Sequence, residues 1–233
     1  YSKPYREVAL EIANLAGVEI NQASFASLGT LAIKKPVGYT YRQAIGLIAQ
    51  FEGGFASFNR DGEVEIRRLR PTDFEVTPES YLLKGFTKNE NAYRIGGITV
   101  RIGEEETDVL RVGSTNGSQI ELENKVMTQT LLNNMWELVK NLNYFPFELK
   151  WRGSPVLEAG DWMYVTDRDG NRYSVPNLSY SLTFNGGLSG ESKATTNSSS
   201  QATYKYRGSL KQRVDWLDSI LSANNWNSNY HDA

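Results

Sequence analysis

The sequence predicts an α+β fold in which a small helix-plus-β-hairpin domain lies next to an antiparallel β-barrel-like domain that carries one long helix. Helical periodicity is confined to a few segments, and many short alternating runs are separated by Asp-Gly and Asn-Gly turns. Several such strands favour a closed or nearly closed barrel. The expected divisions are a helix and β-hairpin domain at 1–76, an antiparallel β-barrel-like domain at 77–188 with a helix near 124–142, a flexible linker at 189–208, and a C-terminal amphipathic helix and tail at 209–233.

The first domain is organised around residues 40–69, which predict a helix running directly into a β-hairpin. Thr40 and Gln43 have the spacing of a capping box, and apolar residues then recur at helical spacing. Two glycines from Gly53 onward end the helix. Asp61-Gly62 predicts a tight turn between two strands, the second of which is expected to point its charged side chains, including Arg67, toward water.

The second domain is predicted to be mainly β, with one long helical segment. Apolar residues at helical spacing place this helix between Glu123 and Leu142 and make it the longest in the chain. Alternation of apolar and polar residues predicts strands up to Phe184. The next stretch is rich in Ser, Thr, Asn and Gly, which is why a flexible linker is expected from Ser189.

Composition excludes several classes of function. The chain has 233 residues, 39% of them hydrophobic and 22% charged, with a net charge of −2 and no basic half. A domain that reads nucleic-acid sequence normally carries a basic surface, so sequence-specific nucleic-acid binding is not expected. There is no cysteine and no apolar run of the roughly 20 residues that span a bilayer. No secretion signal is expected at residues 1–4, because an amphipathic helix is predicted to follow directly. The missing initiator Met predicts a processed chain or a fragment.

Self-association is predicted near the C-terminus. A short heptad-like seam follows 4-3-4 spacing and consists of Leu210, Val214, Leu217 and Leu221. Two heptads are too short to form a stable helix alone, so this segment is expected either to begin a stalk or to dock on another surface.

No catalytic, cofactor-binding or metal-binding residue is predicted. His231 is the only histidine and lies in the polar tail, which argues against a Ser-His-Asp triad or a His-rich metal site. Asp167 begins a segment resembling a calcium loop, but its sixth and twelfth positions hold Arg172 and Leu178 in place of Gly and Glu. The glycine-rich patterns of nucleotide sites are absent.

Two alternatives stay open from residue type alone. Paired carboxylates could serve a cell-wall hydrolase, and the candidates are Glu104, Glu105, Glu106, Asp108, Asp161 and Asp167. Nothing in their spacing marks a cleft, and Asp161 at a strand start can instead bond to local backbone. Aromatic residues could form a sugar-stacking surface of a carbohydrate-binding or host-adhesion module, although such residues more often fill a core: Trp151, Trp162, Tyr164, Tyr173 and Tyr180.

The order of several short motifs resembles one known family. An amphipathic helix, a Gly-Gly break and an N-R-D-G hairpin are followed by I-T-V-R (98–101), E-N-K (123–125), Y-F-P-F (144–147), W-R-G-S-P (151–155), G-D-W (160–162) and L-S-Y-S-L-T-F-N-G-G (178–187). This order is similar to that of baseplate and tail-tip hub proteins of tailed bacteriophages, including the N-terminal structural module of tail-associated lysins of prophages. The similarity extends over roughly residues 5–195.

This resemblance implies a structural protein with no enzymatic activity. It implies a homotrimeric ring that continues or closes the tail tube and anchors distal host-recognition or lysin parts. The implied neighbours are the distal tail protein and the tape-measure protein, and the implied location is the virion, at the phage tail tip, after synthesis in the bacterial host cytoplasm. Relatives begin with a further β-barrel portion and some carry a downstream lysin region, and the sequence departs from both patterns.

Overall fold

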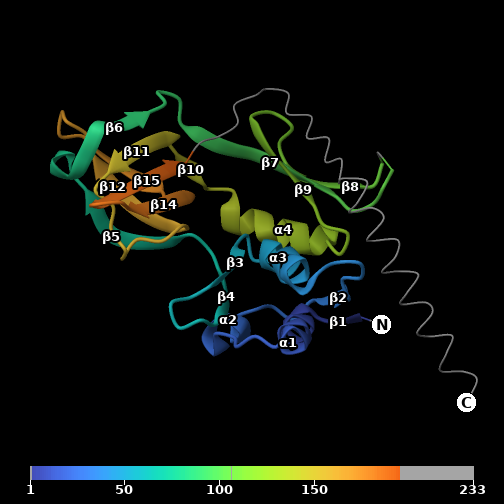
Figure 1. The fold of residues 1–233 in the computed structure, drawn as a ribbon. Coiled ribbons are helices and arrows are strands. Elements are labelled where there is room, and N and C mark those ends of the chain that lie inside the picture. Colours follow the sequence, from blue (N-terminus) through green and yellow to red (C-terminus); the bar gives the residue numbers. More distant parts are fainter. Residues whose placement is uncertain (1, 106, 195–233) are drawn as a thin grey trace, which may run out of the picture.

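The computed structural model describes residues 2–105 and 107–194 and confirms the predicted α+β class (Figure 1). The helices are α1 (Tyr5–Ala16), α2 (Gln22–Ala26), α3 (Tyr41–Phe51) and α4 (Gln129–Val139), with a short 3-10 turn, η1 (Pro78–Ser80). The strands are β1 (Ser2–Pro4), β2 (Ala32–Lys34), β3 (Phe55–Phe58), β4 (Val64–Arg67), β5 (Arg70–Val76), β6 (Tyr81–Lys88), β7 (Tyr93–Arg101), β8 (Val109–Gly113), β9 (Ser118–Glu123), β10 (Asn143–Tyr144), β11 (Phe147–Trp151), β12 (Asp161–Thr166), β13 (Arg172–Pro176), β14 (Ser179–Phe184) and β15 (Leu188–Ala194).

The helix and hairpin predicted at residues 40–69 are confirmed. Thr40 Oγ1 accepts from the Gln43 backbone N–H at 3.3 Å, and Gln43 Oε1 accepts from the Thr40 N–H at 3.0 Å, so the capping box is complete. Strands β3 and β4 then pair antiparallel, with Phe58 opposite Val64 across the predicted turn. These features follow from local sequence alone because each is satisfied within a few residues.

The buried apolar side chains form two clusters. The first cluster joins α1, α3 and the β3–β4 hairpin to α4 and to part of β7, which contributes Ile98 and Val100. In Figure 1, α4 lies between α3 and the β7–β8–β9 strands, and the contacts of α4 with α3 and β8 agree with this position. This cluster therefore crosses the predicted division between 76 and 77, and that division into domains stays a prediction.

Strand β7 lies between β8 and β9, because residues 97–101 pair antiparallel with β8 and parallel with β9. The connection from β8 to β9 must pass over β7, and it does so at two glycines. A Cβ atom at Gly96 would collide with the Asn116 carbonyl oxygen, and one at Gly97 would collide with that of Ser114. Glycine is required here because the two backbones approach too closely for a side chain.

The second cluster lies between two sheets, with strand orders β14-β15-β11-β6 and β13-β12-β5. Its centre contains Phe147, Leu149, Met163 and Val165, all at most 1% exposed. Closure of these strands into a barrel is wrong for the described residues, whose strands form separate sheets. The sheets are mixed, because most pairs are antiparallel but β5 pairs in parallel with β12 and β7 with β9.

The helix predicted near 124–142 is present but shorter, spanning only Gln129–Val139. Asn124 is fully buried, and its Nδ2 donates to the Leu47 carbonyl at 3.0 Å and to Gln50 Oε1 at 2.9 Å. It thereby anchors the loop that precedes α4 against the end of α3. Thr128 then caps the helix by accepting from the Leu131 N–H at 3.3 Å. Because of this tertiary contact, α4 begins at Gln129, later in the chain than the apolar spacing alone predicts.

The linker predicted from Ser189 begins instead as strand β15, so this part of the prediction is wrong. The strand turns Gly190, Ser192 and Ala194 inward, and all three are buried. Its inner face is therefore made of small residues, which leave room for the Trp151 ring, whose Nε1 donates to Ser192 Oγ at 3.1 Å. Small inward residues give no apolar alternation, which explains why the sequence did not predict this strand.

Truncation of a side chain in the first cluster tests this packing. Leu132 on α4 is fully buried, so we expect Leu132→Ala to lower the free energy of unfolding by about 2–5 kcal/mol. Leu138 lies on the same helix but is 44% exposed, and Leu138→Ala should cost much less. Chemical denaturation of both variants measures the difference, and equal losses would contradict the packing described for α4.

Candidate functional site

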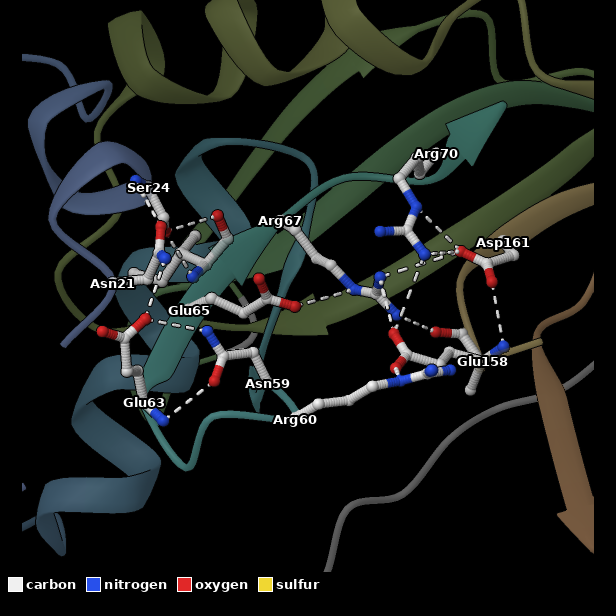
Figure 2. Close-up of polar contacts among 12 residues, drawn as sticks. Asn21, Ser24, Asn59, Arg60, Glu63, Glu65, Arg67, Arg70, Glu158 and Asp161 are labelled. Atoms are coloured by element: carbon white, nitrogen blue, oxygen red, sulfur yellow. Dashed lines mark hydrogen bonds and ion pairs between the residues drawn. The ribbon is translucent and has the colours of Figure 1, made fainter. Parts of the chain in front are cut away.

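Among the residues that the structure describes, the largest group of paired charges lies where the β3–β4 hairpin faces the segment that precedes β12. We call this group the arginine–carboxylate junction, and it consists of Arg60, Arg67, Arg70, Glu158 and Asp161 (Figure 2). The arginines come from the hairpin and the start of β5. The carboxylates come from residues about 90 positions later in the chain. The junction therefore links the first cluster to the second.

Arg60 and Arg70 hold the outer parts of the junction. Arg60 Nε donates to Glu158 Oε1 at 2.8 Å, and its Nη2 donates to the carbonyls of Pro155 and Val156 at 2.7 and 2.8 Å. Arg70 Nη2 donates to Asp161 Oδ1 at 2.7 Å. Both arginine side chains are more than half exposed, so water and salt reach them.

Arg67 occupies the centre of the junction, with a side chain only 13% exposed. Its Nη2 donates to the Ala159 carbonyl at 2.6 Å, and its guanidinium lies 3.3 Å from Glu65 and 3.2 Å from Glu158. Its Nε and Nη1 have ion-pair partners but no hydrogen bond among the described residues. The expectation that Arg67 faces water is therefore wrong, because the second half of the chain covers it.

Backbone geometry fits Asp161 into the junction. Its Oδ2 accepts from the Glu158 N–H at 2.9 Å, which confirms that this strand-start aspartate bonds to local backbone. Gly160 has a φ of +92°, and a Cβ atom there would collide with the Phe55 ring. That ring in turn lies against Arg67, with 5.3 Å between the ring centroid and the guanidinium carbon. The sequence Gly160-Asp161 is thus shaped by the hairpin that it meets.

The charges of the junction suit contacts between two segments of the protein more than acid catalysis. The Arg60 hydrogen bond, with further contributions from the charges of Arg67 and Arg70, lowers the pKa of Glu158 below its usual 4.5. A general acid at neutral pH needs the opposite shift. A depression of about 390 Å³ beside the junction is lined by Asn59, Arg60, Asp61, Glu65, Arg70, Val156 and Glu158. Two of the carboxylates that line the depression, Glu65 and Glu158, form ion pairs with arginines.

The other candidate carboxylates lie elsewhere in the fold. Glu104 pairs with Lys125 at 2.7 Å, and Asp108 accepts from the Glu105 N–H at 3.3 Å, whereas residue 106 lies outside the described residues. Asp167 belongs to the turn between β12 and β13, where hydrogen bonds from the Asn171 side chain and local backbone lower its pKa. Within residues 2–105 and 107–194, no group of three or more His, Cys, Asp or Glu is arranged to hold a metal ion.

Four of the five aromatic candidates belong to the second cluster or pack against it, whereas the Arg172 guanidinium lies 3.5 Å from the centroid of the Tyr164 ring. Trp151 is buried at 4% exposure, and Tyr180 stacks on it with 6.3 Å between ring centroids. Trp162, Tyr164, Tyr173 and Tyr180 are partly buried. Trp151 is thus enclosed by protein and has no face free to stack on a sugar. The self-association seam at Leu210, Val214, Leu217 and Leu221 lies outside the described residues.

Sequence reasoning selected Asp161 but missed Glu158 and the three arginines. One signal was present, because Arg67, Arg68 and Arg70 fall within four residues at the end of the predicted hairpin. A basic run of this kind is usually solvated, so it does not by itself reveal a partner. The partner comes from a distant segment and can be found only from the fold.

No protein-family model matches the sequence, and no curated protein matches it. Among solved structures, the 43 kDa tail protein of prophage MuSo2 from Shewanella oneidensis is similar with a TM-score of 0.52 and 13% identity. The similarity covers 83% of this chain and 66% of that protein, so the chain spans slightly less than two thirds of its length. The fold is therefore one that a prophage tail protein has.

Two further solved structures show weaker similarity. The tail protein from Neisseria meningitidis MC58 has a TM-score of 0.44 and 15% identity, covering 82% of this chain and 65% of its own. The prophage tail protein gp18 from Listeria monocytogenes EGD-e has a TM-score of 0.43 and 11% identity, covering 88% and 63%. Separately, no helix in the part of the chain that the structure describes is long and apolar enough to cross a membrane.

Acidification tests the role of Glu158. Above pH 4.5 this carboxylate is charged in both the folded and unfolded states, so its stabilising contribution is fully present. As the pH falls below 4.5, Glu158 is protonated first in the unfolded chain, because its pKa is lower in the folded protein. Its stabilising contribution is lost as the pH falls through the folded-state pKa. We expect Glu158→Gln to lower the melting temperature near neutral pH and to converge with wild type in acid.

Melting temperatures measured from about pH 7 to about pH 3 would show this convergence. Glu90→Gln is the matched control, because Glu90 pairs with Lys88 but is 87% exposed. It should leave the melting temperature close to wild type throughout. A Glu158→Gln curve parallel to wild type at every pH would contradict the stabilising ion pairs of the junction.

Proposed function

We propose that this protein is a structural component of a phage or prophage tail, acting as a hub of the tail tip or baseplate. The observation that carries this proposal is the fold shared with the MuSo2 tail protein over 83% of the chain. The motif order from residue 98 to residue 187 independently resembles baseplate hub proteins. As a hub, three copies would form a ring that continues or closes the tail tube and anchors distal host-recognition or lysin parts.

The chemistry of the described residues supports a role without bond-making steps. The carboxylates of the junction are neutralised by arginines, and the lowered pKa of Glu158 suits an ion pair more than proton transfer. We therefore propose a non-enzymatic protein of the virion tail tip, made in the host cytoplasm. Its proposed neighbours are the distal tail protein and the tape-measure protein, as the sequence resemblance implies.

Strand β14 offers a surface for self-association. Among the described residues it pairs only with β15, which leaves its other edge open. Charged side chains and proline usually protect an open strand edge, and the sequence from Ser179 to Phe184 contains neither. Leu182 is 40% exposed and Phe184 is 81% exposed. An open, uncharged, apolar edge favours pairing with a neighbouring copy of this chain.

The oligomeric state tests the proposed ring. We expect light scattering over a concentration series to give three times the mass of one chain. Leu182→Lys should shift the equilibrium toward monomer, because a charge would be placed on the β14 edge. The control Leu15→Lys changes a residue of α1 that is 54% exposed and should preserve the trimer. A monomer at every concentration would contradict a self-associating ring built by this chain.

The same measurement tests the terminal seam of Leu210, Val214, Leu217 and Leu221. Leu217→Asp should reduce the oligomer mass if this seam contributes to assembly. An unchanged mass and an unchanged helix content by circular dichroism would remove the seam from the interface. The β14 edge and the seam are thereby tested separately.

A further inference from the structure

The chain passes between the two clusters at three places. Arg68 and Leu69 connect β4 of the first cluster to β5 of the second. Strand β7 connects Tyr93, which packs against the second cluster, to Ile98 in the first. The third passage joins α4 to β10, between Val139 on the first cluster and Leu142 on the second.

Each passage is narrow. The first is two residues long, and the third is a short turn after α4. The middle passage lies inside β7 at Gly96 and Gly97, where the pairing with β9 shifts register between Ile95 and Gly97. Hinges in proteins are formed by a few residues, often at the ends of elements, and the first and third passages have this character. The buried apolar side chains form two separate clusters on either side of these passages.

The arginine–carboxylate junction bridges the clusters beside the first passage, with Arg67 and Arg70 on either side of Arg68 and Leu69 (Figure 2). Most of its contacts are polar, because arginine side chains meet carboxylates and the carbonyls of Pro155, Val156 and Ala159. The Phe55 ring against Gly160 adds one apolar contact. Burial of the Arg67 charge costs desolvation, and two of its nitrogens recover no hydrogen bond among the described residues. The attraction between charges in such a contact offsets little more than the free energy needed to desolvate them. The contact therefore opens more readily than an apolar interface.

We propose that the junction is a salt-releasable latch across a hinge between the two clusters. When it is closed, Arg60, Arg67 and Arg70 hold Glu158 and Asp161 and fix one orientation of the two halves. When ions compete for the exposed Arg60 and Arg70, the latch opens and the halves rotate about the three passages. Each half keeps its own apolar cluster through this change.

Energy transfer between two dyes tests the latch in the full chain. The protein has no cysteine, so Leu15→Cys on α1 and Asp169→Cys in the β12–β13 turn provide one label site in each half. At about 0.1 M salt, where screening extends over roughly 10 Å, we expect one narrow population of transfer efficiency. At about 1 M salt, a second population with a changed efficiency should appear.

Charge removal should reproduce the effect of salt. Arg60→Gln combined with Arg70→Gln changes only exposed side chains and should give the second population already at low salt. Glu158→Gln, on the other side of the junction, should do the same and guards against a folding defect in either variant. Arg172→Gln is the matched control, because its pair with Glu75 lies within the second half. One unchanged population in wild type and both variants, at all salt concentrations, would overturn the latch.

Discussion

The orientation of the two hydrophobic clusters relative to each other depends on one arginine placed between them. Arg67 ends the second strand of the hairpin in the first cluster, and its guanidinium reaches Glu158 and the Ala159 carbonyl beside the second. A buried charge must be compensated, so the segment around it is arranged for that purpose. Gly160 makes room for Phe55, and Asp161 fixes the turn of its own backbone while holding Arg70. The hairpin and the start of β12 thus constrain each other.

Features that depend on neighbours in sequence could be predicted from the sequence. The capping box of Thr40 and Gln43 and the turn at Asp61-Gly62 were predicted correctly, because their hydrogen bonds close within a few residues. Features that depend on distant partners could not. The start of α4 is set by Asn124 binding the end of α3, and β15 is a strand because it pairs with β11 and β14. Neither partner is visible in a local pattern.

The same limit applies to the candidate site. Asp161 was selected as a carboxylate, but its role as a partner of Arg70 depends on a residue 91 positions earlier in the chain. Arg67 alternates with buried residues on its strand and was therefore assigned to water, whereas the second half of the molecule covers it. The order of the motifs, by contrast, resembles that of phage baseplate proteins, which no single local feature indicates. The similarity to the MuSo2 tail protein shows that the fold is one that a prophage tail protein has.

The most direct test of the central claim is a double-mutant cycle across the junction. Unfolding free energies would be measured for wild type, Arg67→Met, Glu158→Gln and the double variant. If Arg67 is held by Glu158 across the two clusters, the two single variants should together lose more unfolding free energy than the double variant does. The difference should be at least about 1 kcal/mol. Losses that add to within about 0.5 kcal/mol would show that the two residues do not interact and would contradict a junction centred on Arg67.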